Sequence, residues 1–136
     1  MRKKARDRNY VGMDKEDYLH AIYHLSELSG AAHISDLARE LGVSKPSASQ
    51  MVERLARERL LVCRPYRDLA LTGKGRTAAR AVHERHQALA AFLTALGVPE
   101  RVRSRDIHGL EHYLSPITLI KIESVTKLLQ ARRKRA

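Results

Sequence analysis

The sequence predicts a mainly helical protein: an N-terminal winged helix-turn-helix with a two-stranded wing, followed by an α-helical dimerisation region. Three observations favour this fold class. Apolar residues recur at helical spacing over most of the 136 residues, two helical patterns are separated by a three-residue turn with a glycine, and a hairpin pattern follows them. Aromatic residues make up only 4% of the chain, so aliphatic residues have to fill the core, which suits helices better than a large sheet.

The first three helices are predicted from apolar spacing and from their end signals. Apolar residues recur at helical spacing over 15–28, and Ser29-Gly30 ends that helix. A short second helix fits 34–41, where Ser35 is a candidate cap and Gly42 a natural C-terminal break. Ser44 opens the third helix, and the proline that follows in its first turn has no N–H that the helix would need.

The pattern then changes to two short extended runs, 61–64 and 69–71, joined by a turn over 65–68. This is the hairpin that forms the wing. Thr72 is a suitable N-cap for a long helix from Gly73 to about residue 96. Two further helices are expected over about 100–114 and 116–130, each with a proline at its start.

The charge of the chain points to a polyanionic partner. The formal net charge is +11 and the isoelectric point about 10.3, which favours nucleic acid or an anionic surface. Cations cluster at both ends, so the segments 1–12 and 131–136 are expected to be flexible basic tails. A single cysteine, Cys63, no long apolar run and no secretory pattern favour a cytoplasmic protein.

The third helix has the side chains of a recognition helix, whose N-terminal residues face base edges in the major groove. They are small or able to form hydrogen bonds, so the backbone can approach DNA closely. Two arginines of the wing are placed to reach a neighbouring phosphate backbone or minor groove. The predicted DNA-binding residues are Ser44, Lys45, Pro46, Ser47, Ser49, Gln50, Arg64 and Arg67.

A second group of residues has the composition of a metal site. His108, Glu111 and His112 are spaced i, i+3, i+4 and share one helix face. Asp17 and His20 have the same i, i+3 relation on the first helix, and a further histidine, His86, lies midway along the long helix. Imidazole and carboxylate ligands together suit a divalent transition metal. The His-x-x-Glu-His order also resembles the inverted zinc-protease motif, but the chain is too short for a protease domain.

From about residue 13 to 130 the chain resembles the DtxR/MntR family of metal-dependent bacterial regulators, and within it the short manganese branch that lacks an SH3-like domain. The resemblance rests on Glu16-Asp17-Tyr18, on 43–52 in the recognition helix, on 69–75 after the wing, on Arg85-His86 and on 106–115. It implies a homodimer with a DNA-binding domain over 13–75 and a helical metal-binding and dimerisation domain over 76–130.

The resemblance also implies the ligand set Asp17, His20, His86, His108, Glu111 and His112, holding one or two divalent metal ions per subunit. Two of these, His20 and His108, stand where the manganese branch has glutamates. Imidazole suits Fe²⁺ or Zn²⁺ better than Mn²⁺, so the metal preference is expected to be shifted from Mn²⁺ toward Fe²⁺ or Zn²⁺.

The predicted function is a metal-dependent transcriptional regulator and not an enzyme: a repressor of metal-uptake genes that binds palindromic operator DNA as a dimer when loaded with metal. No membrane and no small organic substrate are expected as partners. Two alternatives remain open at this stage. One is a winged-helix regulator with a different effector, whose DNA binding would be indifferent to chelators. The other is a metal-dependent hydrolase, which would need an open coordination position and a substrate cleft.

Overall fold

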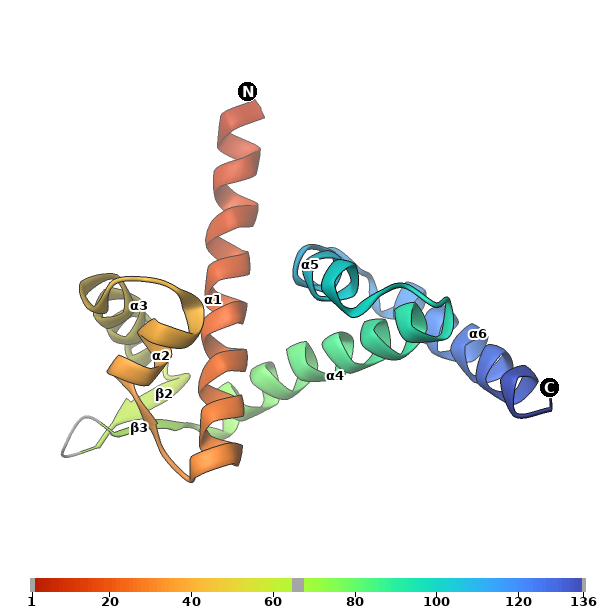
Figure 1. Cartoon of the computed structure of the whole chain (residues 1–136). Coiled ribbons are helices and arrows are strands. Elements are labelled where there is room, and N and C mark those ends of the chain that lie inside the picture. The colour runs from red at the N-terminus through yellow and green to blue at the C-terminus, as the bar shows by residue number, and fades with distance from the viewer. Residues whose placement is uncertain (1, 65–67, 136) are drawn as a thin grey trace. The chain divides into compact units, whose positions relative to one another are not determined.

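A computed structural model describes residues 2–64 and 68–135, with side chains from residue 15 onward. It confirms a mainly helical fold with a small antiparallel sheet (Figure 1). The elements in chain order are α1 (Arg2–Ser29), β1 (Ala32–His33), α2 (Ile34–Leu41), α3 (Lys45–Arg57), β2 (Leu61–Cys63), β3 (Asp68–Leu71), α4 (Gly73–Ala95), α5 (Glu100–Leu110) and α6 (Pro116–Arg135).

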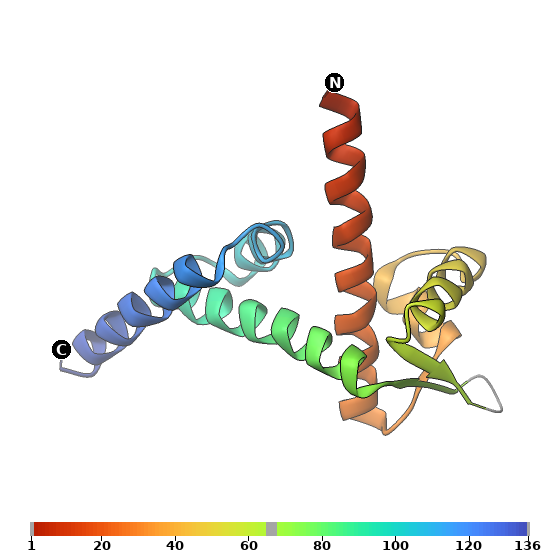
Figure 2. The same ribbon diagram turned by 180° about the vertical axis from the view of Figure 1, so that it is seen from behind.

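The chain divides into two compact units, Met1–Ala81 and Val82–Ala136, and each is described by itself. In the N-terminal unit, α2 and α3 pack against α1, as both ribbon views show (Figures 1 and 2). Its core is aliphatic apart from Tyr18, and it is almost fully buried. The largest buried side chains of this core are Leu19, Ile22, Leu37, Val52, Leu55, Leu61 and Leu69.

The sheet has three antiparallel strands in the order β1-β3-β2. The β2–β3 hairpin is the predicted wing, with Val62 opposite Ala70, and the turn at 65–67 lies outside the described residues. The strand β1 was not predicted. It has only two residues, and its Ala32 pairs with Leu69 on β3, so it is a product of tertiary pairing that carries no periodic signal of its own.

Several predicted helix ends are confirmed. The Ser44 hydroxyl accepts a hydrogen bond from the N–H of Ser47 at 3.2 Å, and Gly42 ends α2 with a φ of +66°. The Thr72 hydroxyl accepts one from the N–H of Gly75 at 3.1 Å. The cap predicted at Ser35 was wrong, because the N-cap of α2 is the preceding His33 and no side chain caps that helix.

Three helices differ in length from the prediction. α1 begins at Arg2 and α6 continues to Arg135, so both segments that were expected to be flexible lie largely within helices. α5 ends at Leu110, four residues earlier than expected, because the chain turns there before Ser115 opens α6. Neither extension contains a proline, and lysine and arginine are good helix formers, so both helices can continue through these segments.

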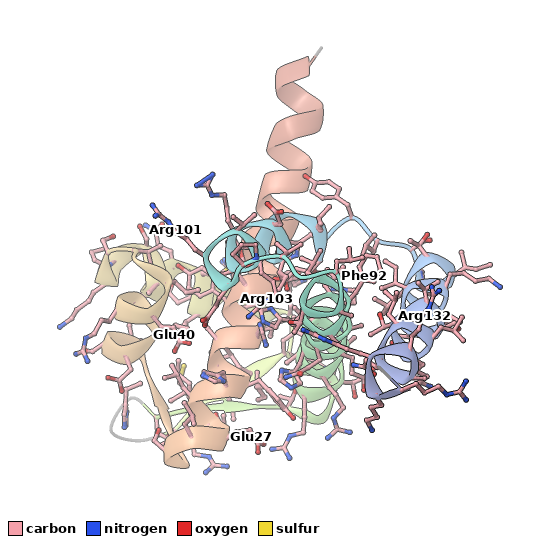
Figure 3. The ribbon with its side chains drawn as sticks, turned by 45° about the vertical axis from the view of Figure 1, so that its right-hand side comes forward. Glu27, Glu40, Phe92, Arg101, Arg103 and Arg132 are labelled. Carbon is pink, nitrogen blue, oxygen red and sulfur yellow. The ribbon has the colours of Figure 1, made fainter. Side chains whose placement is uncertain are left out.

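The C-terminal unit contains most of α4 together with α5 and α6. Its small core consists of Leu89, Leu93 and Ile107, with Phe92 and Ile122 partly buried against them. Phe92 is labelled on α4 in Figure 3. Gly97, with a φ of +81°, ends α4 and turns the chain toward α5. In the part of the chain that the structure describes, no helix combines the length and apolar character that crossing a bilayer requires.

Candidate metal centre and nucleic-acid interface

Four of the six predicted metal ligands lie in the C-terminal unit. His86 is on α4, and His108 lies in the last turn of α5. Glu111 is the C-cap of that helix, and His112 follows it directly. The end of α5 therefore delivers three of the predicted ligands to one place, beside the middle of α4.

The carboxylate of Glu111 is the centre of this group. Its Oε2 lies 3.0 Å from Nδ1 of His86, and its Oε1 lies 3.5 Å from Nε2 of His112. The ring of His108 stands edge-on to that of His112, with centroids 6.3 Å apart. Residue Glu111 is only 2% exposed, so a buried carboxylate is held between imidazoles.

This donor set fits a divalent transition metal. A buried carboxylate is costly unless it is paired, and imidazole nitrogens together with a carboxylate oxygen are ligands that Mn²⁺, Fe²⁺ and Zn²⁺ accept. The carboxylate contacts two of the histidines directly, His86 through Oε2 and His112 through Oε1. The C-terminal unit alone thus supplies three nitrogen donors and one carboxylate.

The other two predicted ligands, Asp17 and His20, lie on α1 in the N-terminal unit. Both are partly buried, and their i, i+3 spacing puts them on one face of the helix. Because they belong to the other unit, their participation in a shared site stays a prediction.

The predicted recognition helix, α3, has one buried and one exposed face. Ala48, Val52 and Leu55 are buried against the core. The predicted DNA-binding residues of this helix and its cap lie on the other face, and all are exposed except Ser49, which is partly buried. They are Ser44, Lys45, Pro46, Ser47, Ser49 and Gln50. Arg64, after β2, is exposed, whereas Arg67 lies outside the described residues.

One contact between α1 and the end of α3 was missed by sequence reasoning. Nζ of Lys15, two residues before Asp17, donates a hydrogen bond to Glu58 at the C-terminal end of α3, at 3.0 Å. This bond, with the positive charges of Lys15, Arg54 and Lys74, holds the pKa of Glu58 below its ordinary value of 4.5. The partners are 43 residues apart, so no local spacing signals the pair.

Both halves of the chain match known protein families. Residues 11–69 match the family described as iron dependent repressor, N-terminal DNA binding domain. Residues 72–131 match the family described as iron dependent repressor, metal binding and dimerisation domain. Together the two matches cover nearly the whole chain.

Curated relatives agree with this assignment. The HTH-type transcriptional regulator MntR of Geobacillus kaustophilus is 39% identical over 115 residues, which cover 85% of this chain and 82% of that protein. The regulator of the same name from Listeria welshimeri is 37% identical over 115 residues, covering 85% of this chain and 81% of that protein.

Solved structures share the fold. A manganese-dependent transcriptional repressor in complex with manganese superposes with a TM-score of 0.75 at 30% identity, covering 83% of this chain and 52% of that one. The manganese regulator SloR gives a TM-score of 0.73 at 28% identity, covering 83% and 53%. The chain spans about half the length of these solved structures.

Proposed function

Because the chain belongs to the iron dependent repressor family of DNA-binding, metal-responsive transcriptional regulators, we propose that it represses metal-uptake genes in the cytoplasm as a homodimer. The observation that carries the metal part of this proposal is the buried Glu111 carboxylate between His86 and His112. It lies within the segment that matches a metal-binding and dimerisation domain.

We propose the full ligand set Asp17, His20, His86, His108, Glu111 and His112. The family resemblance and the grouping of the last four support it. When bound, a divalent cation would supply positive charge to the buried carboxylate and a common centre for the imidazoles. Its affinity should fall in acid, since histidine has to be neutral to act as a ligand.

In this proposal the ligands of α1 and those of the C-terminal unit belong to one site, so loading the site restricts the two units to fewer arrangements. That restriction lowers the entropic cost of placing two recognition helices on a palindromic operator. The exposed Lys45, Ser47 and Gln50 of α3 would then contact the DNA.

The ligand proposal is tested by removing two imidazoles that contact Glu111, in the double variant His86→Ala and His112→Ala. Operator fragments are first selected from genomic DNA with the unaltered protein and metal, and binding is then measured with and without chelator. The double variant should lose the metal-dependent part of binding, whereas His33→Ala, an exposed histidine on β1, should retain it. Metal-dependent operator binding by the double variant would show that the site is elsewhere.

The identity of the metal is part of the proposal. With imidazoles at positions 20 and 108, we expect Fe²⁺ or Zn²⁺ to activate DNA binding at lower free concentration than Mn²⁺. A competitive titration of the metal-free protein measures this order directly. Activation by Mn²⁺ at the lowest free concentration would overturn the predicted preference.

A further inference from the structure

The positive charge of the described side chains is concentrated on α6, far along the chain from the recognition helix. The sequence of α6 contains six lysines and arginines and a single glutamate, which gives it a net charge of +5. The segment 15–81, which includes the helix-turn-helix and the wing, has eleven lysines and arginines against eight carboxylates, a net charge of +3. A DNA-binding role confined to the winged helix does not explain this distribution.

Four of the cations on α6 are consecutive, Arg132–Arg135, and form what is here called the basic turn. Successive residues of an α-helix are about 100° apart around the axis, so four in a row face all directions at the end of the helix. All four are exposed, and Figure 3 labels Arg132 among the sticks of α6. Within the described residues, none of them forms an ion pair with a carboxylate.

A purely structural role accounts for only part of the basic turn. Cations at a helix C-terminus interact favourably with the helix dipole, and this effect is small for exposed side chains. One or two would serve that purpose, and four adjacent like charges repel one another when no anion is present. A polyanion that contacts several of them at once relieves this repulsion. Three of the four are arginines, whose planar guanidinium groups bind phosphate with two parallel hydrogen bonds.

We propose that the basic turn of α6 is a second DNA-binding surface, which contacts backbone phosphates without reading sequence. The proposal rests on the proposed function, because that function makes DNA the polyanion this protein meets. A sequence-independent contact of this kind would keep the regulator on DNA in both its metal-free and its metal-loaded state.

The test neutralises the basic turn in the whole 136-residue chain with Arg132→Gln, Arg133→Gln, Lys134→Gln and Arg135→Gln. A matched control neutralises four other exposed cations of the same unit, Arg101, Arg105, Lys121 and Lys127, so both variants have the same net charge. Circular dichroism and thermal melting check that both variants fold. The probe is a random-sequence 30-base-pair duplex, titrated in chelator over a range of salt concentrations.

The slope of log affinity against log salt should become shallower by about 0.9 for each phosphate that the protein no longer neutralises, hence by roughly 2 to 3.6 for the basic-turn variant. Its affinity at low salt should fall by about tenfold or more, and the control should change much less. Equal changes in both variants would mean that only net charge matters, and no change in either would mean that the basic turn does not touch DNA. Each of these results would overturn the proposal.

A membrane role is separated with vesicles that contain an anionic phospholipid. Loss of vesicle binding with unchanged DNA binding in the basic-turn variant would overturn the proposal in favour of a lipid surface. Failure of the proposed function has a different signature: operator binding by the unaltered protein would be indifferent to metal. The duplex experiment contains chelator, so its outcome does not depend on that result.

Discussion

At the scale of single residues, Gly75 is held against the backbone of Leu60, the residue just before β2. A Cβ atom at this position would overlap the carbonyl oxygen of Leu60, and backbone atoms cannot move aside as a flexible side chain can. The same carbonyl accepts a hydrogen bond from the N–H of Thr72, which fixes it in place. We therefore expect Gly75→Ala to lower the free energy of unfolding by about 1–3 kcal/mol, as measured by urea denaturation.

Gly73, two residues earlier in the same helix, is the matched control. No atom outside its immediate neighbours lies within 4 Å of a Cβ built there. Gly73→Ala should therefore change stability by less than about 0.5 kcal/mol, or raise it slightly, because alanine favours helix. Equal effects at the two positions would show that the contact with Leu60 is not what restricts Gly75.

The Lys15–Glu58 pair should make the free energy of unfolding depend on pH. The folded-state pKa of Glu58 is lowered, first of all by the hydrogen bond from Lys15, so the pair stabilises the fold above pH 4.5. That stabilisation is lost as the pH falls through the lowered pKa. Because Glu58 is more than a third exposed, Glu58→Gln should cost only about 0.2–1 kcal/mol at pH 7 and nothing near pH 2.

Urea denaturation at the two pH values measures the difference, and Glu53→Gln, an exposed carboxylate on the same helix, is the control. A cost for Glu58→Gln that stays the same in acid would mean that it arises from packing.

The Lys15–Glu58 pair also marks a limit of what local sequence spacing can predict. Local spacing identifies groups on one helix, such as Asp17 and His20, but a contact between residues 43 positions apart depends on how helices pack.

At the scale of elements, the recognition helix begins with a cap that the sequence predicted correctly. The Ser44 hydroxyl accepts the N–H of Ser47, one of the free donors of the first turn. Ser44→Ala should lower the free energy of unfolding by about 1 kcal/mol. Ser35→Ala is the internal comparison, since no side chain caps α2, and it should cost much less. Similar losses in denaturant melts of the two variants would contradict a specific capping role for Ser44.

Most elements were predictable because their signals are local. Gly42, Ser44 and Thr72 mark helix ends through their own backbone or hydroxyl chemistry, and each acts in the structure as expected. Strand β1 was not predictable, because two residues have no period and form a strand only by pairing with β3. The extensions of α1 and α6 were missed because charge clusters were taken as a sign of flexibility, although lysine and arginine favour helix.

At the scale of the whole molecule, the choice of metal should be set by two of the proposed ligands. Replacing His20 and His108 with glutamate adds carboxylate ligands, which suit Mn²⁺ better than imidazole does. We expect the double variant to shift the ratio of Mn²⁺ to Zn²⁺ affinity toward Mn²⁺ by about tenfold or more, which is a difference of about 1.4 kcal/mol.

Competitive titration of metal-free protein measures that ratio. The control replaces His24 and His33, which are exposed, with glutamate, so that the same charges are added elsewhere. An unchanged ratio in the His20 and His108 variant, or the same shift in the control, would remove these two residues from the explanation of metal preference.

The last prediction concerns the extent of the site across the chain. A ligand that binds only the folded state at 100 times its dissociation constant stabilises that state by about 2.7 kcal/mol, so Zn²⁺ should raise the melting temperature by a measurable amount. If Asp17 on α1 is a ligand together with Glu111 and its histidines, Asp17→Ala should weaken metal binding and reduce this stabilisation, although the cluster of the C-terminal unit is intact. Metal affinity measured by titration and melting curves recorded at fixed free Zn²⁺ give the two readouts. Affinity and stabilisation that are both unchanged in Asp17→Ala would confine the site to the C-terminal unit, and metal could then no longer regulate DNA binding by tying α1 to that unit.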